Sequence, residues 1–183
     1  MIVCAGRNET FDFAHPIGVG LIESTMNLTR IMLTQKPDSL LFIGSAGSYG
    51  NHKIFDIVIS KTAANIELGF LEEKCYTPLE KIISNTKEQD VSHETKIIVN
   101  SSNYITSDSI SSQKFLTLGL ELENMEFFAL QNIAKEYNIE AYGIFVVTNY
   151  CDENAHKDFI NNHTKAKQLL TKYMKEKDLL NKS

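Results

Sequence analysis

The sequence predicts an α/β protein with a mainly parallel central sheet and helices on both faces, in three layers. The 183 residues are 43% hydrophobic and 22% charged, which suits one globular core rather than a disordered chain. Short apolar runs alternate with longer segments of helical periodicity. Strand–helix–strand units of this kind build a parallel sheet that is covered on both sides. We therefore expect a single domain over residues 1–183.

The expected elements follow one another along the chain. Residues 1–5 are typical of a buried strand, and residues 18–35 carry apolar side chains at helical spacing until Pro37 ends the helix. Residues 39–43 form an apolar strand that we expect to end in a small-residue turn at 44–48. Further strands are expected at 54–60, 97–100 and 141–148, further helices at 123–137 and 155–180, and a polar surface helix and loop at 72–96.

Composition excludes several classes of protein. The net charge is −5, and no basic stripe is present for nucleic acid, whose phosphates are bound mainly by Lys and Arg. No apolar stretch is long enough to cross a bilayer, and the apolar start of the chain is too short for a signal peptide. Three scattered cysteines predict neither a disulfide framework nor a zinc site. We expect a cytoplasmic protein without a metal ion.

Several residues follow expected strands, and in parallel sheets ligands bind beyond the carboxyl ends of the strands. The glycine-rich segment 44–48 presents backbone amides to an anion or a sugar oxygen, or is a plain tight turn. Glu126 and Asp152 are placed for chemistry, or simply complement the amino ends of helices. Tyr104 is a surface aromatic or a face on which a purine stacks.

The order of these features resembles one family. A glycine-rich helix entry is followed by a GSAG segment, an FDIVIS strand, an aromatic residue in a polar loop, Met-Glu, and Asp after an apolar strand. This order is similar to that of the nucleoside phosphorylase superfamily, above all its nucleosidase branch, which acts on 5′-methylthioadenosine and S-adenosylhomocysteine. The similar stretches are 17–23 (IGVGLIE), 36–47 (KPDSLLFIGSAG), 55–60 (FDIVIS), 98–106 (IVNSSNYIT), 124–129 (NMEFFA) and 143–152 (GIFVVTNYCD).

The resemblance implies a phosphorylase-like fold that lacks some of the family's N-terminal strands, because only residues 7–16 link the first strand to the helix entry. It also implies a set of substrate contacts. Glu126 would bind the ribose 2′- and 3′-hydroxyls, with Met125 packing under the sugar. Tyr104 would stack on the purine, and the backbone of Ile105 would contact its edge. Asp152 would protonate the purine N7, for which burial or a nearby negative charge must raise its pKa.

The nucleophile side is implied in the same way. Glu9 is similar in position to the carboxylate that activates water in nucleosidases. Ser45 and the amides of Gly44 and Gly47 would face the attacking water or phosphate. Cleavage of an N-glycosidic bond builds an oxocarbenium-like sugar, as in glycoside hydrolysis, and carboxyls in different environments divide the work.

The nucleophile itself stays open between water and phosphate. Phe42 stands where the hexameric phosphorylases carry a phosphate-binding Arg, and the chain has only Arg7 and Arg30. Hydrolysis of purine nucleosides is therefore preferred, with no cofactor. The alternatives are phosphorolysis, with inorganic phosphate as co-substrate, and nucleoside binding without turnover.

Further alternatives concern histidines and assembly. His15 either reaches the 5′ group of a ligand or is a turn residue. His156 and His163 share a helix face, but no third ligand at metal spacing accompanies them. The family resemblance implies a homodimer or larger homo-oligomer, for which residues 66–71 (IELGFL) are either an interface strip or part of the core.

Overall fold

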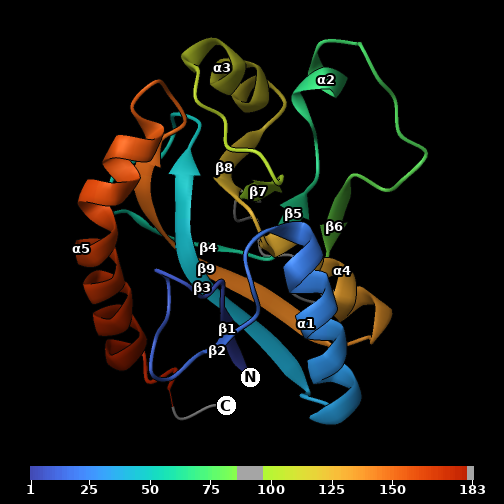
Figure 1. The fold of residues 1–183 in the computed structure, drawn as a ribbon, viewed down its shortest axis with the longest axis vertical. Helices are drawn as coiled ribbons and strands as arrows, with labels where there is room; N and C mark the ends of the chain where they lie inside the picture. The colour runs from blue at the N-terminus through green and yellow to red at the C-terminus, as the bar shows by residue number, and fades with distance from the viewer. Residues whose placement is uncertain (86–96, 181–183) are drawn as a thin grey trace.

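The computed structural model describes residues 1–85 and 97–180 and has the predicted α/β fold. Figure 1 shows a central sheet with α5 against one face and with α1 and α4 against the other. The elements are β1 (Ile2–Cys4), β2 (His15–Pro16), α1 (Gly20–Thr34), β3 (Ser39–Ser48), β4 (Ile57–Ser60), β5 (Thr62–Ala64), α2 (Leu68–Leu71), β6 (Ile82–Ser84), β7 (Ile98–Ser101), α3 (Ser109–Thr117), β8 (Leu120–Asn124), α4 (Phe127–Glu136), β9 (Glu140–Tyr150) and α5 (Ala155–Glu176).

The sheet is mixed and mostly parallel, and its nine strands among the described residues run in the order β2-β1-β3-β8-β7-β5-β6, with β9 beside β3 and β4 beside β9. The longest pairing joins β3 to β9 in parallel, from Ser39 opposite Glu140 to Ser48 opposite Tyr150. A register shift between Ala46 and Gly47 interrupts it. This irregularity lies where the two strands reach their carboxyl ends, the edge at which a parallel sheet binds ligands.

The sheet buries both of its faces, as the continuous apolar runs in the sequence predict. On β3, Leu40 and Phe42 join the core beneath α1 and α4, whereas Leu41 and Ile43 join the core beneath α5. Leu170 of α5 is fully buried in the second core. The strand alternation and the two apolar helix faces thus fix the three layers.

Two predicted elements are wrong in kind. Residues 44–48 are not a turn, because β3 continues through them to Ser48. Glycine serves side-chain packing here: a Cβ on Gly44 would lie 2.8 Å from the ring of Phe42 on the same strand. Residues 123–126 do not begin a helix either. Glu123 and Asn124 end the strand β8, and α4 begins only at Phe127.

The segments at the sheet edge formed by β5 and β6 also differ from expectation. Residues 82–84 of the expected surface helix and loop form the strand β6, and residues 86–96 lie outside the described part of the chain. The short strand β5 was not predicted. Within 66–71, Ile66 is buried and Phe70 and Leu71 pack on the core near α3, so three of the four large apolar side chains of this strip belong to the core. The last helix ends at Glu176, four residues before the predicted end.

Candidate active site

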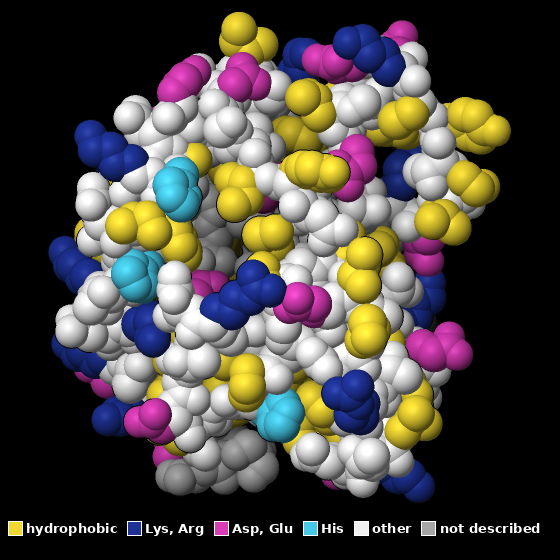
Figure 2. Space-filling model, in the orientation of Figure 1, with side chains coloured by type: hydrophobic (Ala, Val, Ile, Leu, Met, Phe, Trp, Pro, Cys, Tyr) yellow, Lys and Arg dark blue, Asp and Glu magenta, His cyan; other side chains and the backbone are white. Residues whose placement is uncertain are grey.

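A cavity of about 300 Å³ opens at the carboxyl ends of β3, β8 and β9. Its walls come from the loop after β1, the entry to α1, the loop around Ile105, the Met125–Glu126 segment and the first turn of α5. Figure 2 shows a hollow on this face, ringed largely by hydrophobic side chains, with histidines on the side of α5. A cavity that is mainly apolar and holds a few converging polar groups is the usual form of a small-molecule site.

Glu126 is the most deeply buried acid of this cavity, with 3% of its surface exposed. It precedes α4, and its Oε1 accepts a hydrogen bond of 3.0 Å from the amide of Gly20. Asn124 stabilises the turn that enters the same helix, because its Oδ1 accepts from the amides of Glu126 at 2.8 Å and Phe127 at 2.9 Å. Burial, reinforced by the negative charge of Glu9, raises the pKa of Glu126 to about 7.

The amino end of α1 points its free amides at acceptors around the site. The amide of Val19 donates to Glu23, that of Gly20 to Glu126, and that of Leu21 to Oδ1 of Asn103. Glycine is required at position 20, since φ is +81° and a Cβ would lie 2.7 Å from Oδ1 of Asn103. Carboxylates at this helix end also complement its dipole.

Glu9 approaches the same cavity from the loop between β1 and β2. Its Oε1 accepts a hydrogen bond of 3.0 Å from the amide of Ser45 near the end of β3. Burial raises the pKa of the Glu9 carboxyl, and the hydrogen bonds from Ser45 oppose that rise. Lys167 of α5 holds the loop by donating to the carbonyl of Asn8 at 3.2 Å.

A third acid, Glu123, was not predicted as a site residue. It is buried at the end of β8, where Oε1 accepts from the amide of Thr106 at 2.8 Å. Its Oε2 accepts from the hydroxyls of Thr106 at 2.6 Å and Tyr49 at 2.7 Å. Burial raises the pKa of Glu123, while these hydrogen bonds act to lower it. The alternation of residues 120–124 (LELEN) was the available signal, because it is typical of a strand and not of a helix start.

The end of β9 presents Asn149, and not Asp152, to the cavity. Asn149 is 6% exposed and lines the cavity. Asp152 lies outside the lining and is half-buried at the start of α5, where its Oδ1 accepts from the amide of Asn154 at 2.8 Å. Asn154, rather than Asp152, is the N-cap residue of that helix.

Six of the predicted site residues line the cavity together: Glu9, Ser45, Gly47, Ile105, Met125 and Glu126. Three others, Gly44, Tyr104 and Asp152, do not. Tyr104 is 80% exposed and lines a smaller neighbouring cavity of about 200 Å³, which shares Ile105 and Glu123 with the first. His156 also lines the first cavity, from the exposed start of α5.

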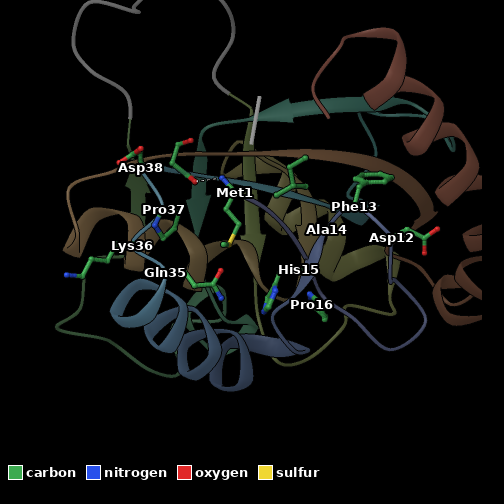
Figure 3. Close-up of a pocket in the computed structure, with 12 residues that line it drawn as sticks. Met1, Asp12, Phe13, Ala14, His15, Pro16, Gln35, Lys36, Pro37 and Asp38 are labelled. Carbon is green, nitrogen blue, oxygen red and sulfur yellow. Dashed lines mark hydrogen bonds between the residues drawn. The ribbon is translucent and has the colours of Figure 1, made fainter. Parts of the chain in front are cut away.

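A larger hollow, of about 780 Å³, lies at the other end of the sheet. Figure 3 shows it between the start of β3, the end of α1 and the loop before β2, with the amino group of Met1 donating to the carbonyl of Ser39. His15 lines this hollow and not the cavity at the carboxyl ends. Since ligands of such sheets bind at the carboxyl ends of strands, the smaller cavity is the candidate active site.

Two further results concern the described residues alone. Within 1–85 and 97–180, no group of three or more His, Cys, Asp or Glu side chains is arranged to hold a metal ion. No helix in these ranges is both long and apolar enough to span a membrane.

The fold and this cavity define an α/β protein with a carboxyl-lined cavity at the carboxyl ends of its sheet strands. The family model of the phosphorylase superfamily matches residues 2–176. The chain therefore belongs to the phosphorylase superfamily, which confirms the resemblance seen in the sequence. No curated protein sequence matches the chain significantly.

Solved structures of the same fold include two Helicobacter pylori proteins. A futalosine hydrolase mutant has 16% identity and a TM-score of 0.79, with 95% of each chain covered. A 5′-methylthioadenosine/S-adenosyl homocysteine nucleosidase in complex with a small molecule has 14% identity and a TM-score of 0.79, covering 96% of this chain and 95% of that one. The corresponding nucleosidase of S. pneumoniae has 12% identity and a TM-score of 0.72, with 93% and 94% covered. At sequence identities this low, the structural similarity shows a shared fold alone.

Proposed function

We propose that this protein hydrolyses the N-glycosidic bond of purine nucleosides. The observation that carries the proposal is the convergence of three carboxyls, Glu9, Glu123 and Glu126, on one mainly apolar cavity. Glu9 comes from the loop after β1, whereas Glu123 ends β8 and Glu126 lies just before α4. Cleavage of this bond places positive charge on the ribose, and carboxylates in a site of low polarity stabilise that charge. Membership of the phosphorylase superfamily supports the same chemistry.

Glu126 and Met125 form the proposed ribose site. The buried carboxyl of Glu126 is held at a fixed position by the amide of Gly20, which suits hydrogen bonds from two neighbouring hydroxyls. Met125 lines the cavity next to it and offers an apolar surface to the sugar ring. The acceptor is preorganised because the starts of α1 and α4 hold it from both sides.

Glu9 is the proposed base for water. Its carboxylate is desolvated, which makes it a stronger base than a carboxylate in water. The hydrogen bond from the amide of Ser45 sets its position against β3, where a Cβ on Gly44 would lie 3.8 Å from the Glu9 Oε2. Ser45 would complete the nucleophile side from the same strand, whereas Gly44 does not line the cavity.

Water is preferred over phosphate because of the cations available. Among the described residues that line the cavity, Arg7 is the only lysine or arginine. Its side chain is 69% exposed and donates to Glu23 at 2.9 Å. A phosphate clamp uses buried, bidentate arginine, and Arg7 does not have this geometry. Phosphorolysis remains the alternative, and its signature is a rate that depends on added phosphate.

The base would lie against Ile105, with Tyr104 closing over it. Tyr104 is exposed on the loop, so stacking requires this side chain to turn toward the cavity. Asp152 stays the predicted proton donor of the family resemblance, although its carboxylate is engaged with the amide of Asn154.

We also propose that the chain forms a homodimer. Ile22, Met26 and Leu33 are large apolar side chains exposed on α1. Figure 2 shows hydrophobic side chains over this helix, on the face that holds the cavity. Sedimentation velocity of the wild type and of Met26→Lys tests the proposal: a dimer that the charge disrupts supports it, and a wild-type monomer at all concentrations contradicts it.

Release of free base is the decisive assay. Inosine, adenosine and 5′-methylthioadenosine are incubated with the wild type, Glu126→Gln and Asp152→Asn, with and without phosphate. We expect release without phosphate and a loss of at least about 100-fold in Glu126→Gln, the size typical for removal of one charge-stabilising group. A strict phosphate requirement would instead establish phosphorolysis.

Nucleoside binding without turnover is the second candidate, and a specific observation favours it. Asn149, whose amide cannot protonate a leaving base, occupies the cavity wall at the end of β9. Under this alternative, calorimetry detects binding of a nucleoside that no variant cleaves, and Asp152→Asn changes neither affinity nor rate.

A further inference from the structure

Residues 102–106 begin the connection between β7 and α3 (Figure 1), and Ile105 within them lines the cavity. The proposed reaction places the base against this residue. The side chain of Ile105 is 57% exposed, so it buries little apolar surface that could fix it in place. The position of Ile105 therefore depends on the hydrogen bonds that its neighbours in the loop make.

Thr106 fixes one end of this loop to the carboxyl of Glu123. Its amide donates to Oε1 of Glu123 at 2.8 Å, and its hydroxyl donates to Oε2 at 2.6 Å. Two donors of one residue thus bind the two oxygens of one buried carboxyl, to which water has little access. Such a paired arrangement restrains the direction of the backbone as well as its distance from β8.

The carboxyl of Glu123 is itself anchored in the core. The hydroxyl of Tyr49 donates to its Oε2 at 2.7 Å, and Nδ2 of Asn100 donates to that hydroxyl at 3.3 Å. The ring of Tyr49 stacks on Phe115 with 4.8 Å between the ring centroids. Asn100 also accepts from the amide of Ile66 at 2.9 Å and donates to its carbonyl at 3.0 Å. All of these partners are buried, so they give Glu123 a fixed position.

The bond between Thr106 and Glu123 does not require one protonation state of the carboxyl. The amide of Thr106 can only donate, so Oε1 has to accept. Oε2 faces the hydroxyls of Thr106 and Tyr49, which donate or accept as they turn. A proton on Oε2 would be donated to one of these hydroxyls. Burial raises the pKa of Glu123, and the loop stays attached with or without that proton.

The start of the loop is held by other elements. Oδ1 of Asn103 accepts from the amide of Leu21 at 2.8 Å, at the entry to α1. The amide of Tyr104 donates to the hydroxyl of Ser102 at 3.0 Å, and that hydroxyl donates to Glu67 at 3.0 Å. With its start held in this way, the loop depends on Thr106 and Glu123 for the placement of Ile105.

Resting on the proposed cleavage reaction, we propose that Glu123 is a positioning residue for base recognition, which through Thr106 holds the backbone of Ile105 at the edge of the base. Both oxygens of Glu123 are occupied by donors of the protein, so it acts on the base through the loop and not by contact. The loop meets the base before and after the bond breaks. Its displacement therefore weakens nucleoside and free base alike and leaves the chemical step unchanged.

Two substitutions detach the loop. Thr106→Val replaces the hydroxyl by a methyl group, and Glu123→Leu removes both acceptors. The substrate is whichever of adenosine, inosine and 5′-methylthioadenosine the wild type cleaves best; its kcat and KM are measured, and calorimetry gives the Kd of its free base. We expect KM and Kd to rise by about 10-fold, the size of one charge-assisted hydrogen bond, with kcat nearly unchanged. A variant that is only less stable lowers kcat and the number of binding sites instead, and keeps KM and Kd.

Conservative variants provide the rescue. Serine in Thr106→Ser keeps the hydroxyl. Glutamine in Glu123→Gln keeps an oxygen for the Thr106 amide and turns its NH₂ group toward the two hydroxyls. Each is expected to recover most of the lost affinity. Glu121→Leu is the matched control on the same strand, because Glu121 pairs with His52 at 2.8 Å and lines neither cavity; KM and Kd keep their wild-type values.

The contrary results are distinct. If Thr106→Val lowers kcat and leaves KM and Kd unchanged, the attachment has only a structural role, and this inference is overturned while the cleavage reaction stands. The inference is also overturned if Glu123→Gln loses as much affinity as Glu123→Leu, since the charge and not the loop would then be recognised. Thermal unfolding identifies any variant that does not fold, and the pair at position 106 decides if Glu123→Leu is one of them. If the wild type cleaves none of the three nucleosides, the proposed reaction itself is overturned, and this inference with it.

Discussion

The buried carboxyl of Glu126 makes the stability of the protein depend on pH in a direction that the structure specifies. Its pKa is raised from the usual 4.5 to about 7 by burial and by the charge of Glu9. A raised pKa means that the folded state binds the proton more tightly than the unfolded state. The stability that this proton contributes is therefore fully present below pH 4.5 and is lost as pH rises through about 7. The difference between these pKa values corresponds to about 3 kcal/mol.

Glu126→Gln is the perturbation that isolates this effect. Glutamine keeps an oxygen that accepts from the amide of Gly20, but it has no charge to desolvate. We expect the free energy of unfolding of the wild type, measured by urea titration, to fall by about 3 kcal/mol more than that of the variant between the two limits of pH.

The comparison with the variant matters because Glu9 and Glu123 also have raised pKa values, so they too make the free energy of unfolding fall as pH rises. Their contributions are present in both proteins. They differ only because Glu9 is no longer repelled by a charge at position 126 in the variant. Parallel curves of unfolding free energy against pH for the wild type and Glu126→Gln would refute the reasoning, since they would show that Glu126 titrates alike in the folded and unfolded states.

Three further predictions rest on packing and exposure. Gly47→Ala should lower the free energy of unfolding by about 1–3 kcal/mol, because the added Cβ would lie 2.6 Å from the Sγ of Cys151. Thermal unfolding measures the loss, and an unchanged midpoint would contradict the prediction. Leu170→Ala should lower the free energy of unfolding by about 2–5 kcal/mol, because it opens a cavity under α5. Urea titration measures this loss, and a loss below about 1 kcal/mol would show that the helix moves to fill the space. A thiol reagent should label only Cys75 in the native protein, because Cys4 and Cys151 are buried. Burial also raises the pKa of Cys4 to about 11. Mass spectra of the native protein with two or three labels would contradict this prediction.

Much of the fold was predictable because each layer leaves a periodic trace in the sequence. The strand at 141–148 and the helix from 155 were predicted from apolar runs and spacing, and they correspond to β9 and α5. The segment 44–48 was predicted wrongly as a turn because glycine has two uses that look alike in a sequence. In β3 it permits the close approach of neighbouring side chains, whereas in a turn it permits a positive φ.

The candidate site was predictable in part. Met125 and Glu126 are predicted by motif order and Glu9 by the family resemblance, and all three line one cavity although Glu9 lies far from the other two in the chain. Glu123 is not predicted because the expected helix at 123–137 includes residues 123 and 124, which end the strand β8. Asn149 was missed because the sequence does not say which of the polar residues after 147 turns inward.

The fold class and the family follow from the sequence alone, since they depend on periodicity and on the order of motifs along the chain, and these also point to the end of the sheet where we propose that a ligand binds. Which side chains face the cavity follows from the tertiary structure. At the end of β9 the register with β3 and the space left by Gly47 turn Asn149 inward, and the start of α5 engages Asp152. Such choices depend on contacts between segments far apart in the chain, and no local pattern records them.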